Sequence, residues 1–463
     1  MPRLAALILP LAACASLQRA PNRPPLDHEG DVLFLLAPRN ADAARVWFDV
    51  GGASAIRADG QVVPLEVPPA SPPAEGTRRQ RLIARGRLEP GAYRGFKLVV
   101  SHPVASLAGD SFDLIAPQAP VEVEAPFSIS ARSATVVSVR AGYGALVAGA
   151  AFAPSFAAMV PPRTVVPLTG YCTNADLQAI TVFDRRASEV TGLIPTGRAP
   201  WGIALDPVAS RAYVALSDED AIAVVDLANP IEVARIRLNA GDSPRELLLT
   251  GDRRTLLAAN AGSNTVSFVD VARMMETARA QTGEQPVSLL ADRKSTRIFV
   301  FNQRGSSISI VDPGNKTVVG TVPLDSPPLR GQIDAAGSRI YVASPLSPYL
   351  SVLRLPDLSQ TSRVYIGTGT TALKVDPATD FLYVAGAGGR TAVFDPFSLL
   401  PIDLIDLPAE ASWLRIDAAE NRMLALLSER GSIVSVNLTT KALVAEFDVG
   451  PEARVLSLVG ERE

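Results

Sequence analysis

The second half of the chain repeats one pattern of apolar and polar positions. In each copy a run of β-forming residues, alternating or continuous, ends in a polar residue that is usually aspartate. These closing residues are Asp184, Asp226, Asp270, Asp312, Arg354, Asp395 and Asn437, at steps of 42, 44, 42, 42, 41 and 42 residues. A second marker, the end of another apolar segment, keeps the same spacing at Asp206, Thr250, Asp292, Asp334, Asp376, Asp417 and Val459. Two independent markers in phase over seven copies indicate a structural repeat.

Each repeat has the pattern of four short strands. In one copy they cover residues 201–205, 211–215, 221–225 and 231–237, and Asp206-Pro207 opens the first turn. Proline presets φ in such a turn, and the aspartate bonds the local backbone. A period of about 40–45 residues with four strands is typical of a β-propeller blade. We therefore predict an all-β fold with a seven-bladed β-propeller over residues 169–461.

The order of the strands predicts how the ring closes. The repeats open at Tyr171-Cys172-Thr173-Asn174, which matches a second strand with no first strand before it. They end at residues 454–459, a first strand with nothing after it. We expect the last strand to complete the blade begun by residues 171–193, a 3+1 closure that leaves no open sheet edge in the ring.

These repeats resemble the YVTN-repeat (YncE-like) β-propeller family. The resemblance rests on Tyr171-Cys172-Thr173-Asn174 and on five later copies, 213–215, 257–260, 299–302, 341–344 and 383–386. It implies the fold and leaves the function open, because the family ranges from surface-layer and cell-envelope proteins to relatives of lactonases and redox enzymes.

Residues 31–142 have the pattern of a second β domain. Strands are expected at 32–36, 44–50, 62–67, 81–88, 93–101, 121–124 and 135–140. Seven short strands in this length predict an immunoglobulin-like or transthyretin-like β-sandwich. The run 88–98, in which Gly91-Ala92-Tyr93 leads into a strand, resembles an uncharacterised domain of exported bacterial lipoproteins. Residues 143–168 are interpreted as a connector without an assigned task.

The N-terminus has the pattern of an export signal. Arg3 precedes an apolar run over residues 4–13, too short to span a bilayer. Leu11-Ala12-Ala13-Cys14 resembles the bacterial lipobox, which implies cleavage after a signal peptide (1–13), a lipid on Cys14 and a linker over 14–30. Ala15 and Ser16 follow the cysteine, so the outer membrane is the expected destination, with the side of the membrane left open. The membrane is then a partner through the lipid anchor.

The composition limits which partners, metal sites and catalytic groups can be expected. A formal net charge of -3 gives no reason to expect nucleic acid as a partner. The two histidines, His28 and His102, precede the repeats, which argues against a histidine-ligated metal or a Ser-His-Asp triad in the ring. We expect no cofactor and no metal. The blade-end aspartates are interpreted as acceptors for backbone amides, and Cys172 as a buried structural thiol.

The first strand of each blade is expected to line the central channel. Aligned on their closing residues, these strands are apolar at nearly all fourth and sixth positions. Their second, third and fifth positions supply the candidate channel ligand-binding residues: Trp201, Arg245, Glu246, Arg330, Gln332, Lys374, Trp413, Arg415 and Arg454. Arg330, Lys374 and Arg415 come from consecutive repeats and form a predicted basic wall. The hypothesis is a site for a carboxylate or phosphate, and the alternative is a water-filled channel with solvated charges.

The leading interpretation is a lipoprotein of the outer membrane whose propeller is a non-enzymatic binding module or scaffold for a cell-envelope protein or a small anionic ligand. The main alternative is a lactonase-like propeller enzyme that uses Glu246 and the basic wall on a small anionic substrate. A third is a cofactor-free accessory subunit of a surface or electron-transfer complex. No catalytic residue is assigned.

Overall fold

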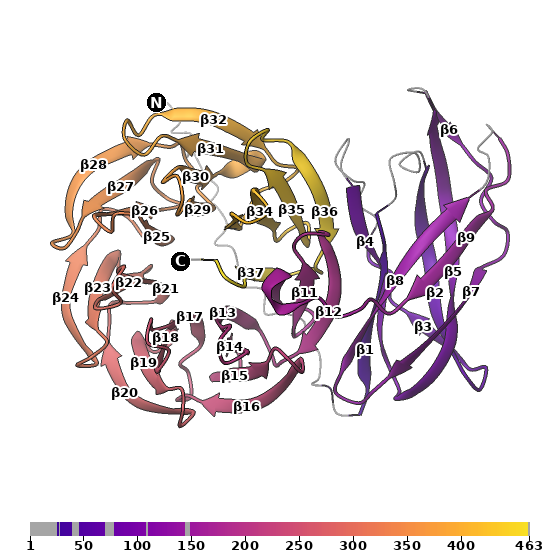
Figure 1. Ribbon diagram of the computed structural model, residues 1–463, viewed down its shortest axis with the longest axis horizontal. Coiled ribbons are helices and arrows are strands. Elements are labelled where there is room, and N and C mark those ends of the chain that lie inside the picture. The colour runs from indigo at the N-terminus through magenta and orange to yellow at the C-terminus, as the bar shows by residue number, and fades with distance from the viewer. Residues whose placement is uncertain are drawn as a thin grey trace, which may run out of the picture.

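Seven groups of four antiparallel strands stand around a ring in the C-terminal part of the chain (Figure 1). The protein is described by a computed structural model that covers residues 26, 28–38, 46–69, 78–107, 110–143 and 149–461. The expected signal peptide, the lipid-bearing Cys14 and most of the linker lie outside the described residues. Within these ranges no helix combines the length and apolar character needed to cross a membrane.

The blades follow one another along the chain. The first contains β10 (Thr169–Asn174), β11 (Ala179–Asp184) and β12 (Glu189–Pro195), with β37 (Ala453–Leu458) as its inner strand. The second and third are β13 (Pro200–Asp206), β14 (Arg211–Leu216), β15 (Ala221–Asp226), β16 (Ile231–Arg237), and β17 (Pro244–Leu249), β18 (Thr255–Asn260), β19 (Thr265–Asp270), β20 (Met275–Gln281). The fourth and fifth are β21 (Pro286–Ala291), β22 (Ile298–Asn302), β23 (Ser307–Asp312), β24 (Thr317–Pro323), and β25 (Arg330–Ile333), β26 (Arg339–Ala343), β27 (Tyr349–Arg354), β28 (Ser359–Tyr365). The last two are β29 (Ala372–Val375), β30 (Leu382–Ala385), β31 (Arg390–Phe394), β32 (Pro401–Asp406), and β33 (Trp413–Asp417), β34 (Arg422–Leu427), β35 (Ser432–Asn437), β36 (Leu443–Asp448). Two short 3-10 turns complete the ring segment, η2 (Val166–Leu168) and η3 (Ala387–Gly389).

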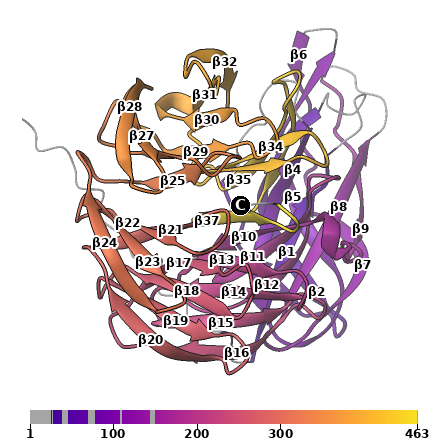
Figure 2. The same ribbon diagram turned by 60° about the vertical axis from the view of Figure 1, so that its left-hand side comes forward.

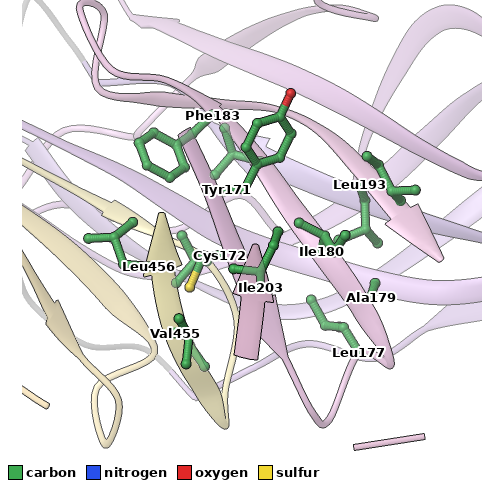
Figure 3. Packing of buried hydrophobic residues seen from close by; sticks show 14 of the residues in the cluster. Tyr171, Cys172, Leu177, Ala179, Ile180, Phe183, Leu193, Ile203, Val455 and Leu456 are labelled. Atoms are coloured by element: carbon green, nitrogen blue, oxygen red, sulfur yellow. The ribbon is translucent and has the colours of Figure 1, made fainter. Parts of the chain in front are cut away.

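Strand β37 closes the ring as the sequence predicts. It pairs antiparallel with β10, with Tyr171 opposite Ser457 and Cys172 opposite Leu456. Figure 3 shows Cys172 beside Leu456 and Ile203 in the core of this blade. Cys172 is fully buried, and burial raises the pKa of its thiol, which confirms it as a structural residue. The fold is therefore a seven-bladed β-propeller with 3+1 closure.

The burial pattern explains why the middle strands are continuously apolar. Strands such as β14 and β18 are buried at nearly every position because both faces pack against neighbouring blades. The outer strands β16 and β24 alternate between exposed and partly buried positions, since only one of their faces meets the ring.

The N-terminal domain is a sandwich of two sheets. One contains β4 (Arg78–Leu88), β1 (Gly30–Leu36), β8 (Ala134–Tyr143) and β9 (Pro154–Met159) in this order. The other contains β3 (Val62–Leu65), β2 (Val46–Arg57), β5 (Gly91–Leu107) and β6 (Asp110–Asp113), and β7 (Val121–Ile129) also pairs with β5. Phe34 of the first sheet packs between Phe96 and Phe127 of the second, with ring centroids 4.8 and 5.7 Å apart.

Two strands of the sandwich were not expected from the sequence. Strand β6 is only four residues long, and β9 lies inside the stretch interpreted as a connector. Strand β9 pairs antiparallel with β8 along its whole length, so this part of residues 143–168 extends the sandwich instead of merely linking two domains. Its alanine-rich sequence gave no clear alternation, which is why the pattern did not reveal it.

The sandwich is joined to the propeller by a shared sheet. Strand β36, the outer strand of the last blade, pairs in parallel with β4. Figure 1 shows the sandwich beside β12 and β36, and Figure 2 shows β12 next to β1 of the sandwich. Leu33, Leu35 and Leu82 of the sandwich belong to the same buried cluster as Phe447 of β36. The sandwich and the blades beside it therefore share one buried hydrophobic cluster, while the interior of the sandwich forms a cluster of its own.

Polar contacts fix this junction. The Arg79 guanidinium lies 2.7 Å from Asp448 and 3.4 Å from Glu446, and all three side chains are largely buried. Asp448 also accepts a hydrogen bond from the Leu82 amide at 2.9 Å. Burial raises the pKa of Asp448, and the Arg79 charge offsets part of that effect. Gln80 completes the contact by accepting a hydrogen bond from the Val190 amide at 2.6 Å.

Candidate functional site

The channel side of the ring is built by the inner strands, several of which carry a β-bulge near their start. The register shifts between Pro200 and Ile203 in β13 and between Pro244 and Glu246 in β17, and a further shift occurs where β37 pairs with β10. A bulge inserts one residue and re-aims the neighbouring side chains. Trp201, Arg245 and Arg454, the candidate residues at the second position, all lie in these bulged segments.

Trp201 is flanked by two arginines from neighbouring inner strands. The guanidinium carbon of Arg245 lies 3.8 Å from the centroid of the Trp201 ring, and that of Arg454 lies 4.6 Å from it. Thr173 of β10 holds the bulge in place because its hydroxyl donates to the Trp201 carbonyl at 2.7 Å and accepts from the Val455 amide at 3.1 Å. We call Trp201, Arg245 and Arg454 the entry cluster, since they lie where the inner strands begin.

Glycine at position 202 allows β13 and β17 to approach closely enough for this stack. A Cβ atom there would lie 2.5 Å from the Arg245 carbonyl oxygen and 2.7 Å from the Glu246 Cα atom. Any larger residue would push the two inner strands apart.

The three cations of the predicted basic wall form a second group, near Trp413. The Arg330 guanidinium carbon lies 3.5 Å from the Trp413 ring centroid, and that of Arg415 lies 5.6 Å from it. Lys374 and Arg415 are 3% and 7% exposed, and both meet the carboxylate of Glu461, at 2.7 and 3.4 Å. Arg415 also donates to the Leu456 carbonyl at 2.8 Å. We call Arg330, Lys374, Trp413, Arg415 and Glu461 the inner cluster.

Glu461 neutralises part of the predicted basic wall. The sequence predicts three cations facing an open channel, whereas the structure places a carboxylate of the chain itself between two of them. Strand β37 lies on the inner side of the ring (Figure 1), and Glu461 follows this strand in the chain. An external anion would have to compete with Glu461 for Lys374 and Arg415. The only signal in the sequence was an acidic residue just beyond the last apolar segment.

Glu246 and Gln332 connect inner strands of neighbouring blades. Glu246 accepts a hydrogen bond from the Leu289 amide at 2.8 Å, which ties β17 to β21. Gln332 accepts one from the Val375 amide at 3.4 Å and donates to the Gly331 carbonyl at 3.1 Å. These bonds give both residues a structural task. Glu246 is thus bound to the main chain at the position where the enzyme hypothesis needs a reactive group.

The blade-end aspartates bond backbone amides, as the sequence analysis expects. Asp226 accepts from the amides of Ala228 and Asn229 at 2.8 and 3.1 Å, and Asp312 from those of Gly314 and Asn315 at the same distances. Backbone hydrogen bonds lower the pKa of both carboxyls below the usual value. Asp184, Asp270 and Asp395 make the same type of bond. In the described part of the chain no group of three or more His, Cys, Asp or Glu residues is placed to hold a metal ion.

A wide groove lies where the sandwich meets the first two blades. Its volume is about 1340 Å³, and its walls come from the β7–β8 turn, residues 160–167, β12 and β16. Val160, Val165, Ile231 and Val233 line it and are 49%, 61%, 56% and 47% exposed. The groove could not be predicted from the sequence, because it is formed by two domains whose docking leaves no periodic signal.

Comparison with known proteins agrees with the class that the ring geometry defines, a β-propeller. Residues 172–376, somewhat less than half of the chain, match a sequence model described as a YncE-like β-propeller. The search of curated proteins finds no match.

Solved structures resemble the chain in fold. One is hydrazine synthase of Kuenenia stuttgartiensis, with a TM-score of 0.50 and 15% identity over 64% of this chain and 93% of that one. Another is the dihydro-heme d1 dehydrogenase NirN in complex with DHE, with a TM-score of 0.52 and 13% identity over 65% of this chain and 77% of that one. At these identities the likeness concerns the fold alone.

Proposed function

We propose that this protein is an exported lipoprotein, anchored to the outer membrane through Cys14, that binds an extended segment of a cell-envelope protein in the groove between its sandwich and its propeller. The observation that carries the proposal is the groove itself, with its exposed valines and isoleucine beside β12 and β16, the outer strands of the first two blades. The lipobox-like sequence before Cys14 supports export and anchoring.

The size and lining of the groove favour a polypeptide over a small molecule. Pockets for small ligands are usually about 300–1,000 Å³ and bury most of the ligand, whereas this groove has a larger volume of about 1340 Å³. Arg163 and Arg235 lie in its wall together with Asp31 and Glu232, which gives polar groups of both signs around the apolar residues. A segment with alternating apolar and polar side chains matches this lining.

The ring also provides a precedent for adding a strand to an outer blade edge. Strand β4 already pairs in parallel with β36, the outer strand of the last blade. Strands β12 and β16 are the outer strands of the first two blades, and both contribute to the groove. An extended segment that pairs with such an edge gains main-chain hydrogen bonds, while its side chains reach alternate pockets.

The side-chain contacts inside the channel favour the groove over the channel as the binding surface. Lys374 and Arg415 are paired with Glu461, and Glu246 is bound to the backbone of the next blade. The groups that the enzyme alternative requires are therefore engaged within the ring. The shared core between ring and sandwich makes the groove a preformed surface, and binding there does not first have to order two domains.

The test compares two valines at equivalent positions of outer strands. Val233 is the third residue of β16 and lies in the groove, whereas Val319 is the third residue of β24, the outer strand of the fourth blade, and does not line the groove. We expect Val233→Asp to abolish recovery of the envelope partner after mild crosslinking and purification of the lipidated protein. Val319→Asp, with a side chain of similar exposure, should leave recovery unchanged. Equal recovery with both variants would contradict the proposal.

A further inference from the structure

Arg245 is a cation without an acceptor in the described structure. Its guanidinium packs on Trp201, but among the described residues it makes no hydrogen bond and no ion pair, and its Nε atom is buried without a partner. Burial and the nearby charge of Arg454 lower the pKa of Arg245, while Asp218 attracts it without forming an ion pair. An uncompensated cation in a partly buried position is costly, so a counter-ion is expected.

Three other cations at the ring centre differ from Arg245 because each has an ion-pair partner. Lys374 and Arg415 share the carboxylate of Glu461, and Arg454 pairs with Glu452 at 3.4 Å. The Nε atom of Arg454 is nevertheless buried without a hydrogen-bond partner, like that of Arg245. The entry cluster therefore contains two guanidiniums with unused donors, and the inner cluster already contains its own anion.

Stacking leaves the donors of Arg245 in a suitable geometry for a ligand. A guanidinium that lies on an aromatic ring uses its face, and its N–H groups remain in the plane for a planar or tetrahedral oxyanion. Arginine binds carboxylate and phosphate oxygens through two parallel hydrogen bonds. Gly202 and Thr173 fix the strand positions on which this stack depends.

We propose that the entry cluster is a second binding site, in which Arg245, assisted by Arg454 and oriented by Trp201, binds the carboxylate or phosphate group of a small molecule. The site is separate from the groove and independent of its occupant. It lies where the inner strands begin and takes one oxyanion group beside an indole ring.

The experiment follows thermal unfolding of the full-length protein in detergent at constant ionic strength, with inorganic phosphate or succinate as the probe. We expect one or both probes to raise the melting temperature in a saturable manner. A response to phosphate alone or to succinate alone identifies the oxyanion that the site takes. In Arg245→Met the affinity should fall at least tenfold, and this variant should melt above the wild type in the absence of probe because a buried unpaired charge is removed.

The matched control is Arg237→Met, which removes an exposed arginine at the end of β16 and should bind as the wild type does. Equal stabilisation of Arg245→Met and wild type by the probes would overturn the proposal, and so would the absence of saturable stabilisation of the wild type by either probe. Because the readout uses the purified protein alone, it is independent of whether a partner binds in the groove.

Discussion

Glu461 supplies the counter-charge for two buried cations at the centre of the propeller. Its carboxylate meets two side chains that are almost fully buried, Lys374 and Arg415. Buried cations need a counter-charge, because the loss of hydration is repaid only by close pairing. The sequence predicts an open anion site at Lys374 and Arg415. In the structure Glu461 already neutralises these two cations, so the group stabilises the fold.

The first prediction concerns this residue. Glu461→Gln should lower the free energy of unfolding by about 3–5 kcal/mol, because it leaves two buried cations without their carboxylate. Urea unfolding checks this, with Glu429→Gln as the control, since Glu429 is exposed. A loss no larger than that of the control would show that Glu461 does not hold the cluster.

The second prediction concerns pH and the blade-end turns. The pKa values of Asp226, Asp312 and Asp395 are lowered from 3.8 in the folded state by backbone hydrogen bonds. A carboxyl whose pKa is lowered on folding stabilises the fold above its unfolded pKa, and that contribution is lost as the pH falls through the folded pKa. We therefore expect stability to fall below about pH 3.8.

Replacing these aspartates with asparagine keeps the hydrogen bonds to the backbone amides of the turn and removes the carboxyl groups that titrate. Asn437 already occupies the same place in the last blade and accepts hydrogen bonds from the Thr439 and Thr440 amides at 2.9 and 2.8 Å. The triple variant Asp226→Asn, Asp312→Asn, Asp395→Asn should fold at pH 7 and show a flatter loss of stability below pH 3.8 in urea titrations. An acid dependence as steep as that of the wild type would refute this account of the turns.

At the residue scale, the features that could be predicted from the sequence are those set by local or repeated patterns. The turn aspartates and the buried Cys172 follow from local pattern and appear as expected. The contacts of Glu461 could not be predicted because they join it to residues of two other blades. The hydrogen bond from the Leu289 amide to Glu246 could not be predicted either, because it depends on the register between blades. Neither contact has a periodic signature.

At the scale of elements, two features shape the molecule: bulged inner strands and the pairing of β4 with β36. The bulges place Trp201, Arg245 and Arg454 together, although these residues belong to three different blades. The order of the propeller strands could be predicted from the repeated pattern, whereas sandwich strands such as β2 and β5 are longer than expected. The bulges and the parallel β4–β36 ladder could not, because both depend on how sheets meet after folding.

The third prediction tests the junction of these elements. Arg79→Ala should lower the free energy of unfolding by about 3–5 kcal/mol, because Glu446 and Asp448 then remain buried without their cation. Arg94→Ala is the matched control, since the ion pair of Arg94 with Glu122 is exposed and such pairs contribute about 0–1 kcal/mol. Calorimetry checks both variants. Equal effects would mean that the buried network does not stabilise the junction.

At the scale of the whole molecule, ring and sandwich act as one body with a groove between them. The sequence predicts both domains, since each has its own pattern of strands. It does not predict their docking, which rests on a shared core of Leu33, Leu82 and Phe447 and on one parallel ladder. The groove, and with it the proposed binding surface, follows from that docking.

The fourth prediction concerns the anchor. Cys14→Ser removes the thiol that the lipobox-like sequence would present for lipid attachment, so the protein should lose its lipid and appear in the aqueous phase on detergent partitioning. Wild type should partition with the membranes. If the variant still fractionated with membranes, the assignment of the anchor to Cys14 would be wrong.

The most direct test of the binding function is site-specific photo-crosslinking in the native envelope. A photoreactive residue at position 233 in the groove is compared with one at position 319, the equivalent position of β24. We predict a discrete adduct with one envelope protein from position 233 and none from position 319. The absence of an adduct from position 233, or the same adducts from both positions, would contradict the proposal that the groove between sandwich and propeller is the binding surface.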